Sequence, residues 1–227
     1  MSYSYFDRIL FIAKLIKEGR IKYLWTVFVR QIFFEEVAFG FKRDLNKEFK
    51  KPRALMELSV RKSNKSDDTF FKDNPNNGLI NHFQTCYVGV TKEAIPCSRL
   101  WLIDSSQNEK LINIWRGTFP KLKLDEYLIE NVFTVPKYRG MGIVSVFMHQ
   151  ISEEAKKLGA NYVITFGAVN NVNTSRAFNY AGFDPYVLRT VKWFLFKKTV
   201  TFEEIPNDIM EVYHKTISRG RSNSRRK

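Results

Sequence analysis

The sequence predicts an α/β (α+β) fold, and three observations support this prediction. Short apolar runs separated by turn-forming residues fill residues 86–115, a pattern typical of a strand meander. From residue 127 onward, apolar strand-like runs alternate with amphipathic helical patterns, which indicates a mixed sheet. The chain has 227 residues, of which 44% are hydrophobic, so it is long enough to bury the core of one domain with extensions.

The N-terminal part is predicted to be helical. Residues 5–34 carry two helical patterns separated by Gly19-Arg20, the first with an apolar stripe and the second apolar nearly all round, and a charged connection follows at 42–53. We therefore divide the chain into four parts: a helical extension at 1–53, a main domain at 54–200, a C-terminal helix at 201–217 and a basic disordered tail at 218–227.

Strands and helices are then predicted in alternation. The predicted strands are residues 55–60, 86–90, 98–103, 111–115, 127–135, 161–167 and 185–198. The predicted helices are residues 79–84, 141–158, 172–181 and 202–214, and a loop-rich stretch covers 62–78.

The turn from Val135 to Val144 is the most informative stretch. Its sequence, VPKYRGMGIV, lies between a predicted buried strand and a predicted helix. The first N–H groups of a helix have no partner within the helix, and glycine lets the backbone approach a ligand closely. The turn therefore predicts a cradle for a phosphate or another anion.

A second motif follows the strand at 161–167. It is the segment from Asn171 to Phe183, NVNTSRAFNYAGF. Together the two motifs, in this order and spacing, resemble the GNAT superfamily of acetyl-CoA-dependent N-acetyltransferases, closely over 127–183 and loosely over 86–198. The resemblance implies a mixed, mostly antiparallel central sheet flanked by helices, and acetyl-CoA as the acyl donor.

The resemblance also implies cofactor-binding residues. The pyrophosphate of CoA would rest on the turn, whose residues are Arg139, Gly140, Met141, Gly142, Ile143 and Val144. Val144 departs from the family pattern, which has glycine or alanine there. Backbone groups of Phe133 and Thr134 would meet the pantetheine arm, and Asn171 would contact the cofactor. Asn171 also suits a helix N-cap, and the two roles are compatible.

Glu130 is the candidate general base. It interrupts an apolar strand, and a buried carboxylate is costly unless it is paired or functional. The alternative is a structural glutamate paired with Arg116. Strand alternation predicts Glu130, Val132 and Thr134 on one face.

The general acid is less clear from the sequence. Where the family often has a tyrosine, this chain has Phe178. Tyr180, two residues further along the helix, is the catalytic candidate that we retain, and Tyr186 is a second one.

The acceptor implied by the resemblance is a primary amine on a small molecule or amino sugar. Residues 62–84 and 184–190 are expected to form its pocket. Two alternatives stay open, a protein or peptide acceptor and a CoA-binding or regulatory module without catalysis.

The net charge of +14 lies mostly at the two ends of the chain. Residues 1–53 hold 12 Lys/Arg against 6 Asp/Glu, residues 54–212 hold 19 against 17, and residues 213–227 hold 6 against none. A nearly neutral main domain argues against nucleic-acid binding. The basic N-terminal helices are expected either to contact an anionic membrane surface or to form a packing arm or homodimer interface.

Two cysteines, Cys86 and Cys97, lack metal-ligand spacing and read as reduced core residues, so no metal is expected. The sequence shows neither a secretory signal nor an apolar run of membrane-spanning length. A cytoplasmic location, with peripheral membrane contact as an alternative, is therefore expected.

Overall fold

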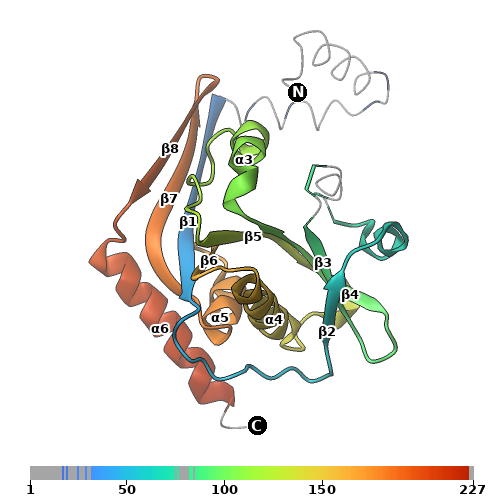
Figure 1. Ribbon diagram of the computed structural model, residues 1–227. Helices are drawn as coiled ribbons and strands as arrows, with labels where there is room; N and C mark the ends of the chain where they lie inside the picture. Colours follow the sequence, from blue (N-terminus) through green and yellow to red (C-terminus); the bar gives the residue numbers. More distant parts are fainter. Residues whose placement is uncertain are drawn as a thin grey trace.

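The computed structural model describes residues 32–74 and 85–224, together with residues 17, 19, 25, 29, 76, 82 and 83. Within them an eight-stranded sheet has the order β2-β3-β4-β5-β6-β1-β7-β8 (Figure 1). The strands are β1 (Phe33–Asp44), β2 (Ser59–Lys62), β3 (Cys86–Val90), β4 (Pro96–Ile103), β5 (Glu126–Thr134), β6 (Tyr162–Ala168), β7 (Asp184–Phe194) and β8 (Lys197–Glu203). Only β5 and β6 pair in parallel, so the predicted mixed, mostly antiparallel sheet is confirmed.

Helices lie on both faces of this sheet. The α-helices are α3 (Asn108–Trp115), α4 (Ile143–Lys157), α5 (Val172–Tyr180) and α6 (Asn207–Ser224). The described residues also include the short 3-10 helices η1 (Lys65–Phe71), η3 (Ser105–Gln107) and η4 (Pro136–Tyr138). Figure 1 shows α4 and α5 beside each other and α6 running past them toward the C-terminus.

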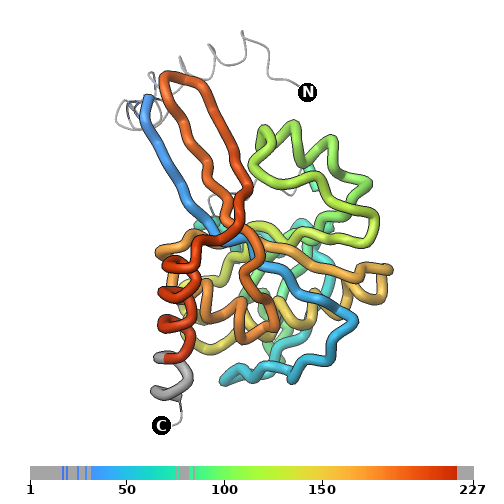
Figure 2. Tube along the Cα trace, turned by 90° about the vertical axis from the view of Figure 1, so that its left-hand side faces the viewer, coloured from blue at the N-terminus to red at the C-terminus, as the bar shows by residue number. Residues whose placement is uncertain are grey.

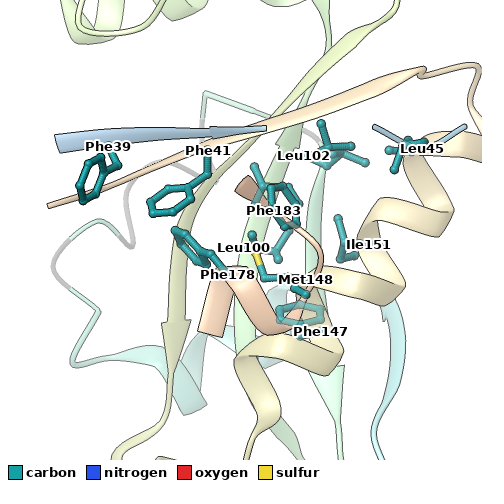
Figure 3. Close-up of a cluster of buried hydrophobic side chains, with 14 of the residues drawn as sticks. Phe39, Phe41, Leu45, Leu100, Leu102, Phe147, Met148, Ile151, Phe178 and Phe183 are labelled. Atoms are coloured by element: carbon teal, nitrogen blue, oxygen red, sulfur yellow. The ribbon is translucent and has the colours of Figure 1, made fainter. Parts of the chain in front are cut away.

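The main core lies between the sheet and helices α4 and α5. Figure 3 shows aromatic rings from β1 and α5 meeting apolar side chains of α4 and β4 there. A second cluster on the opposite face packs Leu111 of α3 against Trp101, Leu128 and Ile164. Both faces are thus covered near the middle of the sheet, which is the arrangement expected of a layered domain.

The sequence prediction was wrong about β1. Residues 33–44 were assigned to a helical extension and a charged connection, whereas they form a strand between β6 and β7. Phe39 and Phe41 alternate into the core, which is the period of a strand. Lys17, Trp25, Val29 and Ile32 are helical and Gly19 lies in a turn, but the other residues before Ile32 lie outside the described residues.

Three other boundaries also differ from the predictions. The predicted strand 111–115 belongs to helix α3, because Leu111, Ile114 and Trp115 share one helical face on the second cluster. The long predicted strand 185–198 is a hairpin, β7 and β8, that turns at Leu195 and Phe196. The C-terminal helix continues to Ser224, through much of the predicted disordered tail.

A buried cation joins β1 to the helices. Arg43 donates hydrogen bonds to Nδ1 of His149 (3.0 Å), to the carbonyl of Ala181 (3.1 Å) and to the carboxylate of Glu153 (2.8 Å). Burial, and next the Arg43 charge, lower the pKa of His149, which suits the acceptor role of its neutral ring. This network fixes the register of β1 under α4 and α5.

We expect Gly182→Ala to destabilise the fold more than Gly159→Ala does. Both glycines have positive φ (+88° and +96°), so alanine is strained at either site. Only at Gly182 would the new Cβ also lie 2.9 Å from the ring of Phe49. Urea unfolding should show that Gly159→Ala lowers the free energy of unfolding by about 1 kcal/mol and that Gly182→Ala lowers it by roughly 2–3 kcal/mol.

When Phe49→Ala is combined with Gly182→Ala, part of the extra loss in the free energy of unfolding should be recovered, because the ring that crowds the new Cβ is gone. Equal losses in the two single variants would contradict crowding by Phe49.

Candidate functional site

The site begins where β5 and β6 separate. The two strands are paired only from Glu126 to Leu128 and from Tyr162 to Ile164, although β5 continues to Thr134 and β6 to Ala168. Beyond the paired residues, the edge of each strand that faces the other has no ladder partner in the described part of the chain. The result is a gap inside the sheet where main-chain groups are available to a ligand.

A bulge in β5 shapes one side of the gap. Asn131 has φ of +53°, and Asn131 and Val132 together stand opposite Leu100 of β4. The extra residue changes the alternation, so Val132 packs on the main core with Ile129 and not on the face of Glu130. The prediction that Glu130 and Val132 share a face was therefore wrong.

Glu130 is half-buried at the start of this gap. Burial raises the pKa of its carboxyl to about 7, while the Arg189 charge and the N–H of Asn131 oppose that rise. The alternative partner Arg116 forms no ion pair with Glu130 in the described structure. A carboxyl with a pKa near 7 is suited to accept a proton at neutral pH.

Two residues that the sequence reading missed stand near Glu130. Arg189 of β7 is buried, donates to Glu36 of β1 (2.9 Å) and lies against the rings of Phe119 and Phe166. Its charge stabilises the ionised form of Glu130, and the charge of Glu36 acts in the opposite direction. An arginine directly after the apolar run 185–188 was the available signal, but its partner lay in the unrecognised strand β1.

The turn after β5 has the features of an anion cradle. Gly140 and Gly142 both have φ of +77°, and Gly142 is the N-cap of α4. None of the N–H groups from Gly140 to Ser145 has a hydrogen-bond acceptor within the described residues. Six consecutive unpaired donors at a helix start form a site for a phosphate group.

The connection from β1 to β2 packs against this turn. The N–H of Leu55 donates to the carbonyl of Met141 (2.9 Å), and the carbonyl of Arg53 lies 2.9 Å from where a Cβ on Gly142 would be. Glycine at 142 is therefore required by this close approach as well as by its backbone angle.

Backbone groups at the end of β5 divide between β4 and the gap. Val135 N–H donates to Cys97 of β4, so alternation directs the backbone of Phe133 to β4 and that of Thr134 toward the gap. The carbonyl of Thr134 accepts a bond from Arg139 Nε (3.0 Å). Of the two predicted backbone contacts, the geometry thus favours Thr134, and Arg139 reaches the same point.

Asn171 caps helix α5. Its side-chain oxygen accepts a hydrogen bond from the N–H of Thr174 (3.1 Å), as the N-cap reading expects. Asn171 is exposed. It lies three residues after Ala168, the last residue of β6, at the end of the strand where β6 is no longer paired with β5.

The two tyrosine candidates lie on different elements. Tyr180 is exposed at the last residue of α5, and Tyr186 of β7 lies beside Lys42, which pairs with Glu126 of β5. Phe178 is buried between Phe41 and Phe183 and close to Gly167 of β6. A catalytic role of Tyr180 stays a prediction.

The loop expected to bind the acceptor approaches the bulge. Asn76 donates to the side-chain oxygen of Asn131 (3.3 Å), and Asn131 donates to Asn74 (3.5 Å). The preceding helix η1 is held to the sheet by ion pairs of Asp67 with Arg61 and of Asp68 with the fully buried Arg99. Part of the predicted acceptor loop therefore contacts Asn131, the residue that follows Glu130 in the chain.

The surroundings of the two cysteines are those of structural core residues. Cys86 and Cys97 are buried and form no disulfide with each other, and burial raises the pKa of each thiol to about 11.

The described residues hold no cluster of three or more metal-ligating side chains. None of their helices has both the length and the apolar character needed to cross a bilayer.

No sequence model of a known protein family matches the chain, and no curated protein matches it either. Solved structures do match it. One is the GCN5-related glucosamine N-acetyltransferase region of a fungal multi-domain GH3 β-N-acetylglucosaminidase, with a TM-score of 0.54 and 13% identity over 75% of this chain and 22% of that chain.

Two further structures show the same likeness. A Drosophila protein gives a TM-score of 0.51 and 12% identity over 79% of this chain and 58% of that one. A GCN5-related N-acetyltransferase from Sphaerobacter thermophilus gives 0.50 and 10% over 75% and 56%. The chain thus spans less than two thirds of the length of each of these proteins. The chain thus has the fold of the GCN5-related N-acetyltransferases, the GNAT fold.

Proposed function

We propose that this chain transfers an acetyl group from acetyl-CoA to a primary amine. The observation that carries the proposal is the position of Glu130, a half-buried carboxyl with a pKa near 7 at the gap between β5 and β6. The GNAT fold of the chain supports the proposal. The unpaired N–H groups of the glycine turn and the backbone of Thr134 fit the phosphates and the amide-bearing arm of CoA.

The residues of the site would act in sequence. Acetyl-CoA, when bound, supplies a thioester carbonyl that an amine can attack. Glu130 accepts a proton from the ammonium form of the acceptor, directly or through water, because a protonated amine has no free electron pair. The neutral amine would then attack the thioester carbon, the C–N bond would form, the C–S bond would break, and the nitrogen would lose its second proton to solvent. The departing thiolate would take a proton from solvent, because Phe178 has no hydroxyl to donate, and Glu130 would release its proton to solvent.

We favour a small amine over a long peptide as the acceptor. Arg189, whose charge acts on Glu130, lies against the rings of Phe119 and Phe166, and Asn131, the residue after Glu130, donates to Asn74. One structure of the same fold is described as a glucosamine N-acetyltransferase region, and an amino sugar is the acceptor class that we favour. A protein or peptide acceptor is the alternative.

A second candidate function is CoA binding without turnover. The observation that favours it is Phe178, which is buried where related enzymes often have a proton-donating tyrosine. The two functions share the glycine turn and differ in the role of Glu130.

Glu130→Gln tests the catalytic role. We expect kcat/KM for an amine acceptor to rise between pH 6 and pH 8 in the wild type, since Glu130 loses its proton near pH 7 and can then act as the base. The variant should lose that rise and about 10²- to 10⁴-fold of kcat/KM at pH 8, with the Kd for CoA unchanged. A thiol-release assay over an amine and amino-sugar panel gives the rates, and calorimetry gives the Kd.

Activity that Glu130→Gln leaves intact would show that Glu130 is not the base. CoA binding with no acetylation of any amine, by wild type or variant, would favour the binding module.

Substitutions of its two charged neighbours should move this pH profile in opposite directions. Without the Arg189 charge, the pKa of Glu130 rises, so Arg189→Met should shift the activity rise to higher pH. Without the Glu36 charge, the pKa falls, so Glu36→Gln should shift the rise to lower pH. Arg189→Lys keeps the charge and serves as the control. Shifts of the same sign would contradict the assignment of the titrating group to Glu130.

Gly142→Ala should weaken CoA binding more than Gly140→Ala. Both positions have φ of +77°, but only at 142 would the Cβ meet backbone, the Arg53 carbonyl at 2.9 Å. The turn must then move, and its N–H groups lose their common direction. We expect at least a tenfold rise in Kd for Gly142→Ala by calorimetry, with thermal unfolding as the check on the fold. Equal effects at the two positions would argue against a role for this close approach.

A further inference from the structure

The tip of the β7–β8 hairpin exposes large apolar side chains. Phe194, Leu195 and Phe196 are 57%, 61% and 54% exposed, and Phe33 at the start of the neighbouring strand β1 is 62% exposed. Figure 2 shows this hairpin and the start of β1 rising together away from the body of the molecule. Adjacent exposed apolar residues at a projecting point mark a contact surface.

The turn itself holds residues that a water-exposed hairpin does not favour. Leu195 and Phe196 are the two central residues, with φ of +44° and +66°. A two-residue turn with both φ values positive favours Asn-Gly, because bulky side chains are strained there. The hairpin would therefore be easier to form with other residues, which points to a role of Leu195 and Phe196 outside the turn.

Positive charge accompanies these apolar side chains. Lys192 and Lys197 are exposed on the hairpin, and Glu35 on β1 is the acidic residue opposite Lys192. Lys198 is engaged elsewhere, because its Nζ donates to the Trp115 carbonyl (2.7 Å) and so holds the hairpin to α3. Lysines beside an apolar tip complement anionic headgroups while their stems lie along apolar surface.

The chain before β1 joins the sheet at the same point. The N–H of Leu195 donates to the carbonyl of Ile32 (3.0 Å). Residues 1–31 hold 6 Lys/Arg against 2 Asp/Glu and carry the amphipathic pattern Phe6, Ile9, Leu10, Ala13, Ile16. A basic, amphipathic sequence therefore enters the fold beside an apolar tip that has its own lysines.

We propose that this tip, defined as Phe33, Phe194 and Leu195 with Lys192 and Lys197, is a membrane-contact site. It would insert its apolar side chains into the headgroup region of an anionic bilayer, with the lysines at the phosphates. The site is separate from the gap between β5 and β6 and does not depend on the proposed activity. It would hold the protein peripherally at a surface.

The experiment is sedimentation of the full chain with vesicles of phosphatidylcholine alone or with 30 mol% phosphatidylserine. We expect wild-type protein to bind the anionic vesicles and to release at high salt. Leu195→Asn should lower the partition coefficient at least tenfold and keep the thermal midpoint, because asparagine is favoured at the first central position of this turn. Leu124→Asn, at a residue that is 92% exposed, is the matched control and should bind as wild type does.

A second measurement is independent of removing apolar side chains. Leu195→Trp keeps the tip apolar, and its added fluorescence should be quenched by brominated lipids, whereas that of Leu124→Trp should not. Failure of the wild type to bind anionic vesicles would overturn the proposal. So would equal binding by Leu195→Asn. A tip variant that changes only the oligomeric mass in light scattering would also overturn it and would assign the tip to a second copy of the chain.

Discussion

The short parallel pairing of β5 with β6 is the constraint on which the rest of the site depends. Three residue pairs join the strands, and then they separate while each stays bound on its other side, to β4 and to β1. Their continued pairing with β4 and β1 keeps the unpaired edges extended and separate. The gap is therefore a rigid, preformed opening in which main-chain donors and acceptors are available without unfolding any strand.

The bulge at Asn131 couples this backbone arrangement to the chemistry. Without the extra residue, the alternation of β5 would place Val132 on the same face as Glu130. Because of the bulge, Val132 packs on the core instead, and the side chain next to Glu130 is the polar one of Asn131. Charges then converge on Glu130 from β1 and β7, through Glu36 and Arg189. Three strands distant in sequence meet at one carboxyl, and the balance of burial against the arginine charge sets its pKa near neutrality.

Strand β1 has two effects that extend beyond the sheet. By lying between β6 and β7 it supplies Phe39 and Phe41 to the core and Glu36 to the site. Because β2 is at the far edge of the sheet, the connection to it must cross the helical side, and on its way it packs Phe49 on Gly182 and Arg53 on Gly142. The glycine turn is thus supported from outside by a segment that precedes it by almost ninety residues.

The sequence by itself determined the local features of this protein. The glycine turn, the cap at Asn171, the carboxyl of Glu130 inside an apolar strand and the helices on either side of β6 follow from spacing and from the chemistry of neighbouring residues. The GNAT fold could be predicted from them for the same reason, since a strand, a turn and a helix are contiguous in the chain. Only the tertiary structure decided the position of β1, the bulge in β5, the helical state of 108–115 and the partners of Glu130. These depend on contacts between residues far apart in the sequence, where packing outweighs local propensity: an apolar run such as 111–115 suits a strand or a helix until the face it must cover is known.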